Sequence, residues 1–388
     1  MPDGRRLLVL YKLLAPALIA TRGYAALEVT KAYARARDLA AEPALGAADV
    51  FPINFGLWLY ELVRGDMHAS LVAARACASA SDDADLAVEA HRALGATSYY
   101  LGNFAEADAH LRRAIAAHDP VRHADHGFRF GGDPGVVCHL YLSLTCCFRG
   151  RADEAVTLAD EALAAAQDVR HPFSEAYALG FRAWTFQLLG DVERAAESAQ
   201  RATHLSEEHG FPFWIGFGTM LDGWIRARLG AEEAREGDRL MRRALEILRA
   251  TGAGLWESYW NVLLADAALA RGATSEAAAF LRGGVAHAET MGERFALPLL
   301  LTSQATVRSR EEEPDEAASL ALLDRARALA KANDDRLGAL RSSLERVRLC
   351  AGTDREAEAQ ALLAEDRAPF VGQAAARHLL IVPASLRR

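Results

Sequence analysis

The sequence predicts an all-α protein, built as one continuous solenoid of about eight helical hairpins over residues 1–388. Apolar helical stretches end at glycines that recur mostly about 40 residues apart. These are Gly65, Gly102, Gly150, Gly190, Gly230 and Gly272. An alanine-rich segment follows each glycine, and alanine has the highest intrinsic helix propensity. No stretch shows a convincing strand pattern. Because a solenoid adds modules to a shared core, this length does not require two or three globular domains.

Each hairpin is expected to pair an apolar first helix with a more polar second helix. A glycine ends the first helix because it adopts the left-handed conformation without strain. The expected second helices span residues 67–81, 104–118, 152–167, 192–208, 239–250 and 274–290. Two degenerate hairpins continue the array over about 300–370, with second helices at 314–331 and 356–365.

The hairpin at residues 88–120 is the clearest. Gly95 and Ala107 are small enough to let its two helices approach closely, and Asn103 can cap the second helix. Its pattern resembles the tetratricopeptide repeat at Leu94, Gly95, Gly102, Phe104, Ala107 and Ala114, with Pro120 one place late and Ser98 where an aromatic residue is expected. The resemblance implies a right-handed superhelix whose first helices line a concave face.

Residues 119–135 interrupt the repeat pattern as an inserted loop. Long loops on repeat scaffolds often bind ligands, so Phe128, Arg129 and Phe130 are candidate binding residues. His123, His126 and His139 could form a metal site, but their spacing matches no compact metal motif. We therefore favour ordinary loop and helix histidines, and no metal site is predicted.

The search for catalytic chemistry returns no motif. Only three lysines are present, and no phosphate-binding loop or hydrolase signature occurs. Gly216 and Gly218 could begin a dinucleotide fingerprint, but they lie inside a helical repeat. We therefore predict no catalytic residue and no cofactor, and lean against an enzyme. The net charge of −8 argues against a nucleic-acid partner.

The expected location is the cytoplasm. The five cysteines are scattered and odd in number, which favours buried reduced thiols over a disulfide framework. No run of 18 apolar residues lacks a charge, so no membrane span is expected. A signal peptide at residues 5–20 is disfavoured because Lys12 and Pro16 interrupt its apolar stretch.

Aromatic residues of the first helices are the main functional clue. All six tryptophans fall there, and some are expected to face the groove, although aromatic rings also fill cores. Asp222 is expected to pair with Arg226 or to line a cavity. The candidate groove residues are Tyr177, Trp184, Trp214, Asp222, Trp256, Tyr259 and Trp260.

Several stretches together resemble the C-terminal tetratricopeptide-like region of bacterial multidomain signalling ATPases, which often carry a class III adenylate cyclase domain. The stretches are residues 14–26, 91–96, 130–135 and 209–212, and the likeness covers about 10–310. It implies a sensor or partner-binding array and carries over no catalytic residue, since the cyclase and NTPase motifs are absent from this chain.

Two functions remain open from the sequence. The first is a non-enzymatic interaction module that binds a peptide, a protein partner or a small effector on its concave face and loop, with a homodimer possible. The second is a stand-alone enzyme or small-molecule-binding protein with a cavity around Trp214, Asp222, Trp256 and Tyr259. An open, shallow groove would favour the first and a deep apolar cavity the second.

Overall fold

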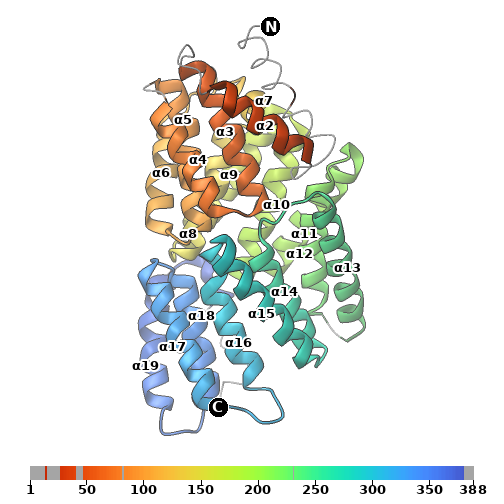
Figure 1. The fold of residues 1–388 in the computed structure, drawn as a ribbon. Coiled ribbons are helices and arrows are strands. Elements are labelled where there is room, and N and C mark those ends of the chain that lie inside the picture. The colour runs from red at the N-terminus through yellow and green to blue at the C-terminus, as the bar shows by residue number, and fades with distance from the viewer. Residues whose placement is uncertain (1–13, 15–26, 41–46, 81–82, 230, 380–388) are drawn as a thin grey trace.

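The computed structural model describes residues 14, 27–40, 47–80, 83–229 and 231–379. Eighteen α-helices lie in these ranges and, after α2 (Leu27–Ala40), they pack as consecutive hairpins (Figure 1). The expected all-α, tetratricopeptide-like fold and the number of hairpins are thus confirmed. The stretch considered as a signal peptide lies almost wholly outside the described residues.

The first helices of the eight hairpins are α3 (Ala47–Arg64), α5 (Ala84–Tyr100), α8 (Pro134–Phe148), α10 (Pro172–Leu189), α12 (Pro212–Arg226), α14 (Glu257–Ala270), α16 (Leu297–Arg308) and α18 (Arg336–Cys350). The second helices are α4 (Met67–Ala80), α6 (Phe104–Ala117), α9 (Ala152–Val169), α11 (Val192–His209), α13 (Ala231–Ala250), α15 (Thr274–Met291), α17 (Glu316–Ala332) and α19 (Glu356–Arg367). Short helices are α7 (His126–Phe130), η1 (Arg294–Ala296), η2 (Ala368–Phe370) and η3 (Ala374–Ala376).

Local sequence explains where these helices begin and end. Gly190 ends α10 with φ of 77°, a left-handed conformation that suits glycine, and Asp191 then caps α11 by accepting a hydrogen bond from the backbone of Arg194. Asn103 occupies the expected cap position of α6, but its side chain makes no capping bond. The sequence placed the start of one second helix too late, at residue 239, whereas α13 begins at Ala231. The charged residues before 239 belong to the first turns of an amphipathic helix and not to a loop.

Small residues allow the close helix packing that was expected. A Cβ atom on Gly95 would lie 2.7 Å from the Cγ atom of Leu111, so α5 and α6 require glycine there. Similarly, a Cβ atom on Gly223 would lie 2.8 Å from the carbonyl oxygen of Gly237, where α12 meets α13. Gly216 and Gly218 also face neighbouring helices, which gives them a packing role in place of a dinucleotide fingerprint.

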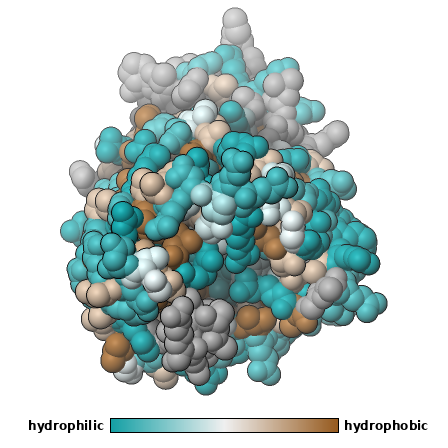
Figure 2. All heavy atoms as spheres, turned by 90° about the horizontal axis from the view of Figure 1, so that it is seen from below, coloured by the Kyte–Doolittle hydropathy of each residue, from teal (hydrophilic) through white to brown (hydrophobic). Residues whose placement is uncertain are grey.

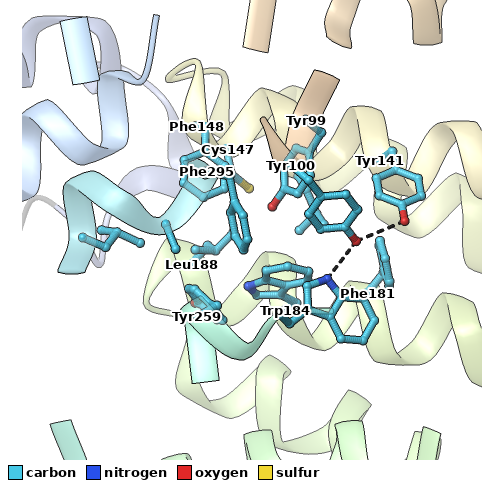
Figure 3. Close-up of a cluster of buried hydrophobic side chains, with 14 of the residues drawn as sticks. Tyr99, Tyr100, Tyr141, Cys147, Phe148, Phe181, Trp184, Leu188, Tyr259 and Phe295 are labelled. Atoms are coloured by element: carbon cyan, nitrogen blue, oxygen red, sulfur yellow. Dashed lines mark hydrogen bonds between the residues drawn. The ribbon is translucent and has the colours of Figure 1, made fainter. Parts of the chain in front are cut away.

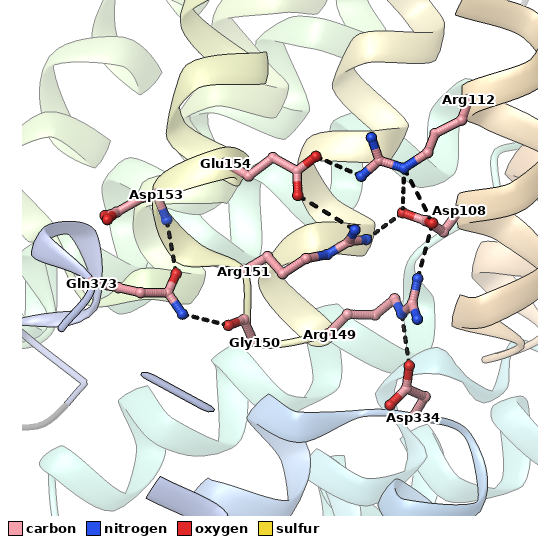
Figure 4. Close-up of polar contacts among 9 residues, drawn as sticks. All are labelled: Asp108, Arg112, Arg149, Gly150, Arg151, Asp153, Glu154, Asp334 and Gln373. Atoms are coloured by element: carbon pink, nitrogen blue, oxygen red, sulfur yellow. Dashed lines mark hydrogen bonds and ion pairs between the residues drawn. The ribbon is translucent and has the colours of Figure 1, made fainter. Parts of the chain in front are cut away.

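The solenoid folds back on itself, so that its early hairpin turns contact segments about five hairpins later. The backbone N–H of Gly254, between α13 and α14, donates to the carbonyl of Val63 at 3.0 Å. Arg149, in the turn after α8, donates to Asp334 before α18 at 2.7 Å (Figure 4). Gln373 likewise donates to the carbonyl of Gly150 at 2.7 Å. These contacts join the α3–α9 end to the α14–α19 end.

Aromatic side chains fill the centre of this arrangement. Tyr100 accepts a hydrogen bond from the indole of Trp256 at 2.7 Å, and its oxygen lies 3.1 Å from that of Tyr141 (Figure 3). Trp184 contacts Trp256 edge to face, with ring centroids 5.7 Å apart. The rings belong to a buried cluster that extends along the hairpins from Phe51 to Ala376. The five cysteines are buried as free thiols, as expected.

Candidate functional site

The tryptophans expected to face a groove lie in the core instead. Trp184, Trp256 and Trp260 are at most 2 % exposed, and Trp214 is 3 % exposed. Tyr259 is buried too, and its hydroxyl donates to the side chain of Gln187. The expectation that rings face a groove is therefore wrong for these five residues, because they are buried among the rings of neighbouring helices. Whether any of these rings contacts a ligand stays a prediction.

Tyr177 and Asp222 are the partly exposed members of the expected groove set. The Tyr177 ring contacts Trp214 with centroids 4.5 Å apart and planes tilted by 33°, so Tyr177 lies at the edge of the same aromatic core. Asp222 points elsewhere, into a surface cleft between α11 and α13. The structure therefore does not assemble the cavity of Trp214, Asp222, Trp256 and Tyr259 that the second function requires.

The segment expected as an inserted loop is partly helical. It contains α7, whose three expected binding residues have different positions. Phe128 is 91 % exposed and Arg129 lies at the surface beside Asp125, whereas Phe130 is buried against Phe55 with ring centroids 5.0 Å apart. Only Phe128 and Arg129 are thus presented to a partner.

A buried charged group holds this segment in place. Arg92 of α5 donates to the carbonyls of Gly132 at 2.9 Å and Phe130 at 3.2 Å, and to Glu89 at 3.0 Å. The other oxygen of Glu89 lies 3.1 Å from Nδ1 of His126. Burial lowers the pKa of Arg92, but the Glu89 carboxylate and the nearby tyrosine and cysteine side chains together outweigh burial, so the pKa is raised. The contacts of Arg92 with Phe130 and Gly132, and of Glu89 with His126, were not predictable from the sequence, because these partners lie about 40 residues apart.

The histidines considered as metal ligands each have a local partner. Nδ1 of His123 accepts from the backbone of Asp119 at 3.0 Å, and Nδ1 of His139 donates to the carbonyl of Gly135 at 2.6 Å. Over the part of the chain that the structure describes, no three His, Cys, Asp or Glu side chains are grouped so as to hold a metal ion.

A cleft beside Asp222 is a candidate site within the described residues. Helix α12 forms its floor, α11 and α13 form its walls, and its volume is about 240 Å³, which is room for roughly eight water molecules. It is a surface cleft that is open to solvent and not an enclosed cavity. Its lining residues are Gln200, Thr203, His204 and Glu207 of α11, Ile215, Thr219 and Asp222 of α12, and Leu240, Arg243 and Ile247 of α13.

Polar contacts fix Asp222 at the floor of this cleft. Its carboxylate accepts from Arg226 at 2.8 Å and from the amide of Gln200 at 3.2 Å. The hydrogen bond with Asp222 raises the pKa of Arg226. The expected pairing of Asp222 with Arg226 is thus confirmed. The sequence missed the rest of the cleft, although Ile215, Thr219 and Asp222 follow helical spacing along one face of α12.

Little apolar surface is exposed on the face of the molecule that Figure 2 shows. At the α14–α19 end, the described residues form a mainly hydrophilic face with small, separate apolar patches (Figure 2). Such patches are ordinary on folded proteins and do not mark a broad binding surface. Among the described helices, none is long and apolar enough to cross a membrane.

Comparison with solved structures supports the fold. The chain is similar to a Rap protein crystallised with competence and sporulation factor, with a TM-score of 0.65 and 12 % identity over 95 % of this chain and 99 % of that one. It is also similar to the Rap conjugation gene regulator of plasmid pLS20 in complex with a Phr peptide, with a TM-score of 0.55, 10 % identity and 94 % of each chain covered.

A third similar structure is aspartyl phosphate phosphatase F from Bacillus subtilis, with a TM-score of 0.50 and 11 % identity over 96 % of this chain and 94 % of that one. No protein-family model matches, and no curated protein matches by sequence. The family is therefore not resolved, and the resemblance to the repeat region of signalling ATPases stays a prediction. At these identities the likeness establishes a tetratricopeptide-like helical-repeat fold shared with the Rap structures.

Proposed function

We propose that this protein is a non-enzymatic tetratricopeptide-like module that binds a peptide or a segment of a protein partner. One observation carries the proposal: the fold extends over 95 % of this chain and 99 % of a Rap protein that was crystallised with competence and sporulation factor. The pLS20 regulator, also similar along nearly its whole length, was solved with a peptide. A sensor or signalling role in the cytoplasm would fit such a module.

The binding site we propose is the cleft between α11 and α13. The rings of Trp184 and Trp256, which the sequence favoured as groove residues, are buried, whereas the cleft is open to solvent and is lined by both apolar and polar side chains. An open cleft favours the interaction module over the enzyme, for which we expect a deep cavity with converging polar groups. A small effector or a second copy of the chain are alternative occupants.

Filling the cleft tests this proposal. Thr219 lies on the cleft floor, so Thr219→Trp places an indole in a volume of about 240 Å³. The full-length protein is first used to select peptides from a random library, and the affinity of the best peptide is measured by calorimetry. We expect Thr219→Trp to weaken this peptide at least about tenfold, or about 1.4 kcal/mol.

Thr157→Trp is the matched control, because Thr157 is an exposed residue of another second helix, α9. It should bind like the wild type. Equal affinity for the wild type and both variants would exclude the cleft as the binding site. If the wild type selects no peptide from the library, the proposed function is wrong.

A further inference from the structure

We propose that the cleft recognises a peptide segment with an apolar anchor side chain, a carboxylate on one flank of the anchor and a cationic group on the other. This inference rests on the proposed function and names the chemistry of its ligand. It follows from the charges that line the two walls.

The apolar part of the cleft comes from three aliphatic side chains. Ile215 lies on the floor, and Leu240 and Ile247 lie on the α13 wall. All three are only partly buried, so an apolar side chain placed between the walls removes further aliphatic surface from water. The small volume accommodates one side chain rather than a folded surface.

Four residues that line the cleft can carry charge, and two of them already have partners. Asp222 accepts from Arg226 and Gln200, as described above. His204 lies 3.4 Å from Glu208, one turn further along α11 and outside the cleft. A bound ligand would have to compete with these contacts.

Arg243 and Glu207 are different. Arg243 projects from the α13 wall and Glu207 from the α11 wall, and both are exposed. Within the described residues neither forms an ion pair, although the adjacent Arg242 bonds Asp238 at 2.9 Å. The cleft thus has an unpaired cation on its α13 wall, between Leu240 and Ile247 in the sequence, and an unpaired anion on its α11 wall.

These opposed charges would fix the direction of the ligand. A carboxylate next to the anchor would meet Arg243, and a cation on the other flank would meet Glu207. Complementary charges at an open site set orientation and exclude wrong partners more than they add affinity. Each exposed pair is expected to change affinity several-fold, and the two together about tenfold.

The test uses synthetic nonapeptides with capped ends and a central isoleucine. Their two flanking residues are Asp and Lys, Lys and Asp, or Asn and Gln. Affinity for the full-length protein is measured by fluorescence anisotropy at low and moderate salt. We expect one charged order to bind about tenfold more tightly than the neutral peptide, with the difference shrinking as salt screens the pairs.

Exchanging the two wall charges sharpens the test. The double variant Glu207→Lys/Arg243→Glu should prefer the opposite order of Asp and Lys, a reversal that loss of folding cannot produce. Arg282→Glu is the control, since Arg282 is exposed on α15 and forms no ion pair within the described residues. It should leave the preference unchanged.

The outcomes separate this inference from the proposed function. One outcome is that peptides bind and Thr219→Trp blocks them, while the order of Asp and Lys has no effect or the double variant does not reverse the preferred order. In that case the proposed charge recognition is wrong and the proposed function stands. If peptides bind but none responds to Thr219→Trp, the cleft is not the binding site and this inference is wrong. If no peptide binds at all, the proposed function is wrong as well.

Discussion

Arg92→Met removes the buried cation that holds the segment of residues 126–132 against α5. Arg92 is 2 % exposed, and its guanidinium donates to Glu89 and to two backbone carbonyls. Methionine has a similar length and apolar character, so the variant deletes the charge with little change in packed volume. Glu89, which is fully buried, keeps only His126 as a partner.

The expected loss follows from these contacts. Removing one partner of a buried ion pair costs about 3–5 kcal/mol, because it leaves an uncompensated charge in the interior. A carbonyl left without a donor costs about 1–3 kcal/mol if water cannot reach it. Because the contributions overlap and the surface segment can relax, we expect Arg92→Met to lower the free energy of unfolding by about 3–5 kcal/mol.

The double variant Glu89→Met/Arg92→Met distinguishes charge from packing. It removes both charges and leaves the carbonyls of Phe130 and Gly132 and the Nδ1 atom of His126 without these partners, but no uncompensated charge. It should therefore be less destabilised than Arg92→Met alone, by about 1–2 kcal/mol. Unfolding is followed by urea titration. Trypsin cleavage after Arg129 reports local release of the segment, because repeat arrays need not unfold in one step.

Arg282→Met is the control for loss of an exposed arginine, and it should stay within about 0.5 kcal/mol of the wild type. The reasoning is refuted if Arg92→Met costs less than about 1 kcal/mol, or if the double variant is less stable than the single one. Either result would show that Glu89 and Arg92 do not depend on each other.

Three further predictions concern other parts of the fold. If the ion pair of Arg149 with Asp334 joins the two ends of the solenoid, a double-mutant cycle of Arg149→Ala and Asp334→Asn should show a coupling energy of about 1 kcal/mol. Asparagine replaces Asp334 because this residue has a φ of 57°, which asparagine tolerates. A coupling energy of zero would show that the ion pair does not stabilise this contact. Burial raises the pKa of Glu293 to about 7, so the folded protein keeps a proton that the unfolded chain loses above its ordinary pKa of 4.5. The free energy of unfolding should therefore fall by about 3 kcal/mol as pH rises from 4.5 to 7. Urea titrations at several pH values should show a weaker pH dependence for Glu293→Gln than for the wild type. An unchanged pH dependence would show that Glu293 does not cause the fall. Gly223→Ala should destabilise by about 1–3 kcal/mol in thermal melts, because its Cβ would press on the α13 backbone. Gly283→Ala should be neutral or stabilising, because its Cβ would make only an ordinary contact, 3.7 Å from the side chain of Asn261; equal effects of the two substitutions would contradict the close-contact argument.

Local sequence features determined the helices. Turn glycines such as Gly190 and cap residues such as Asp191 act within a few residues, so seven of the eight second helices were located to within about two residues. The pairing of Asp222 with Arg226 was also predictable, because residues four apart lie on the same side of a helix.

The position of the site was decided by the tertiary structure. Whether Trp256 faces a groove or a core depends on its contact with Tyr100, 156 residues earlier, and no local pattern encodes that contact. The cleft between α11 and α13 likewise depends on the packing of three helices. The sequence alone therefore identified Asp222 of α12 as a candidate site residue, but not Arg243 of α13. Helices follow from interactions over three or four residues, whereas surface and interior are set by contacts between hairpins far apart in the chain.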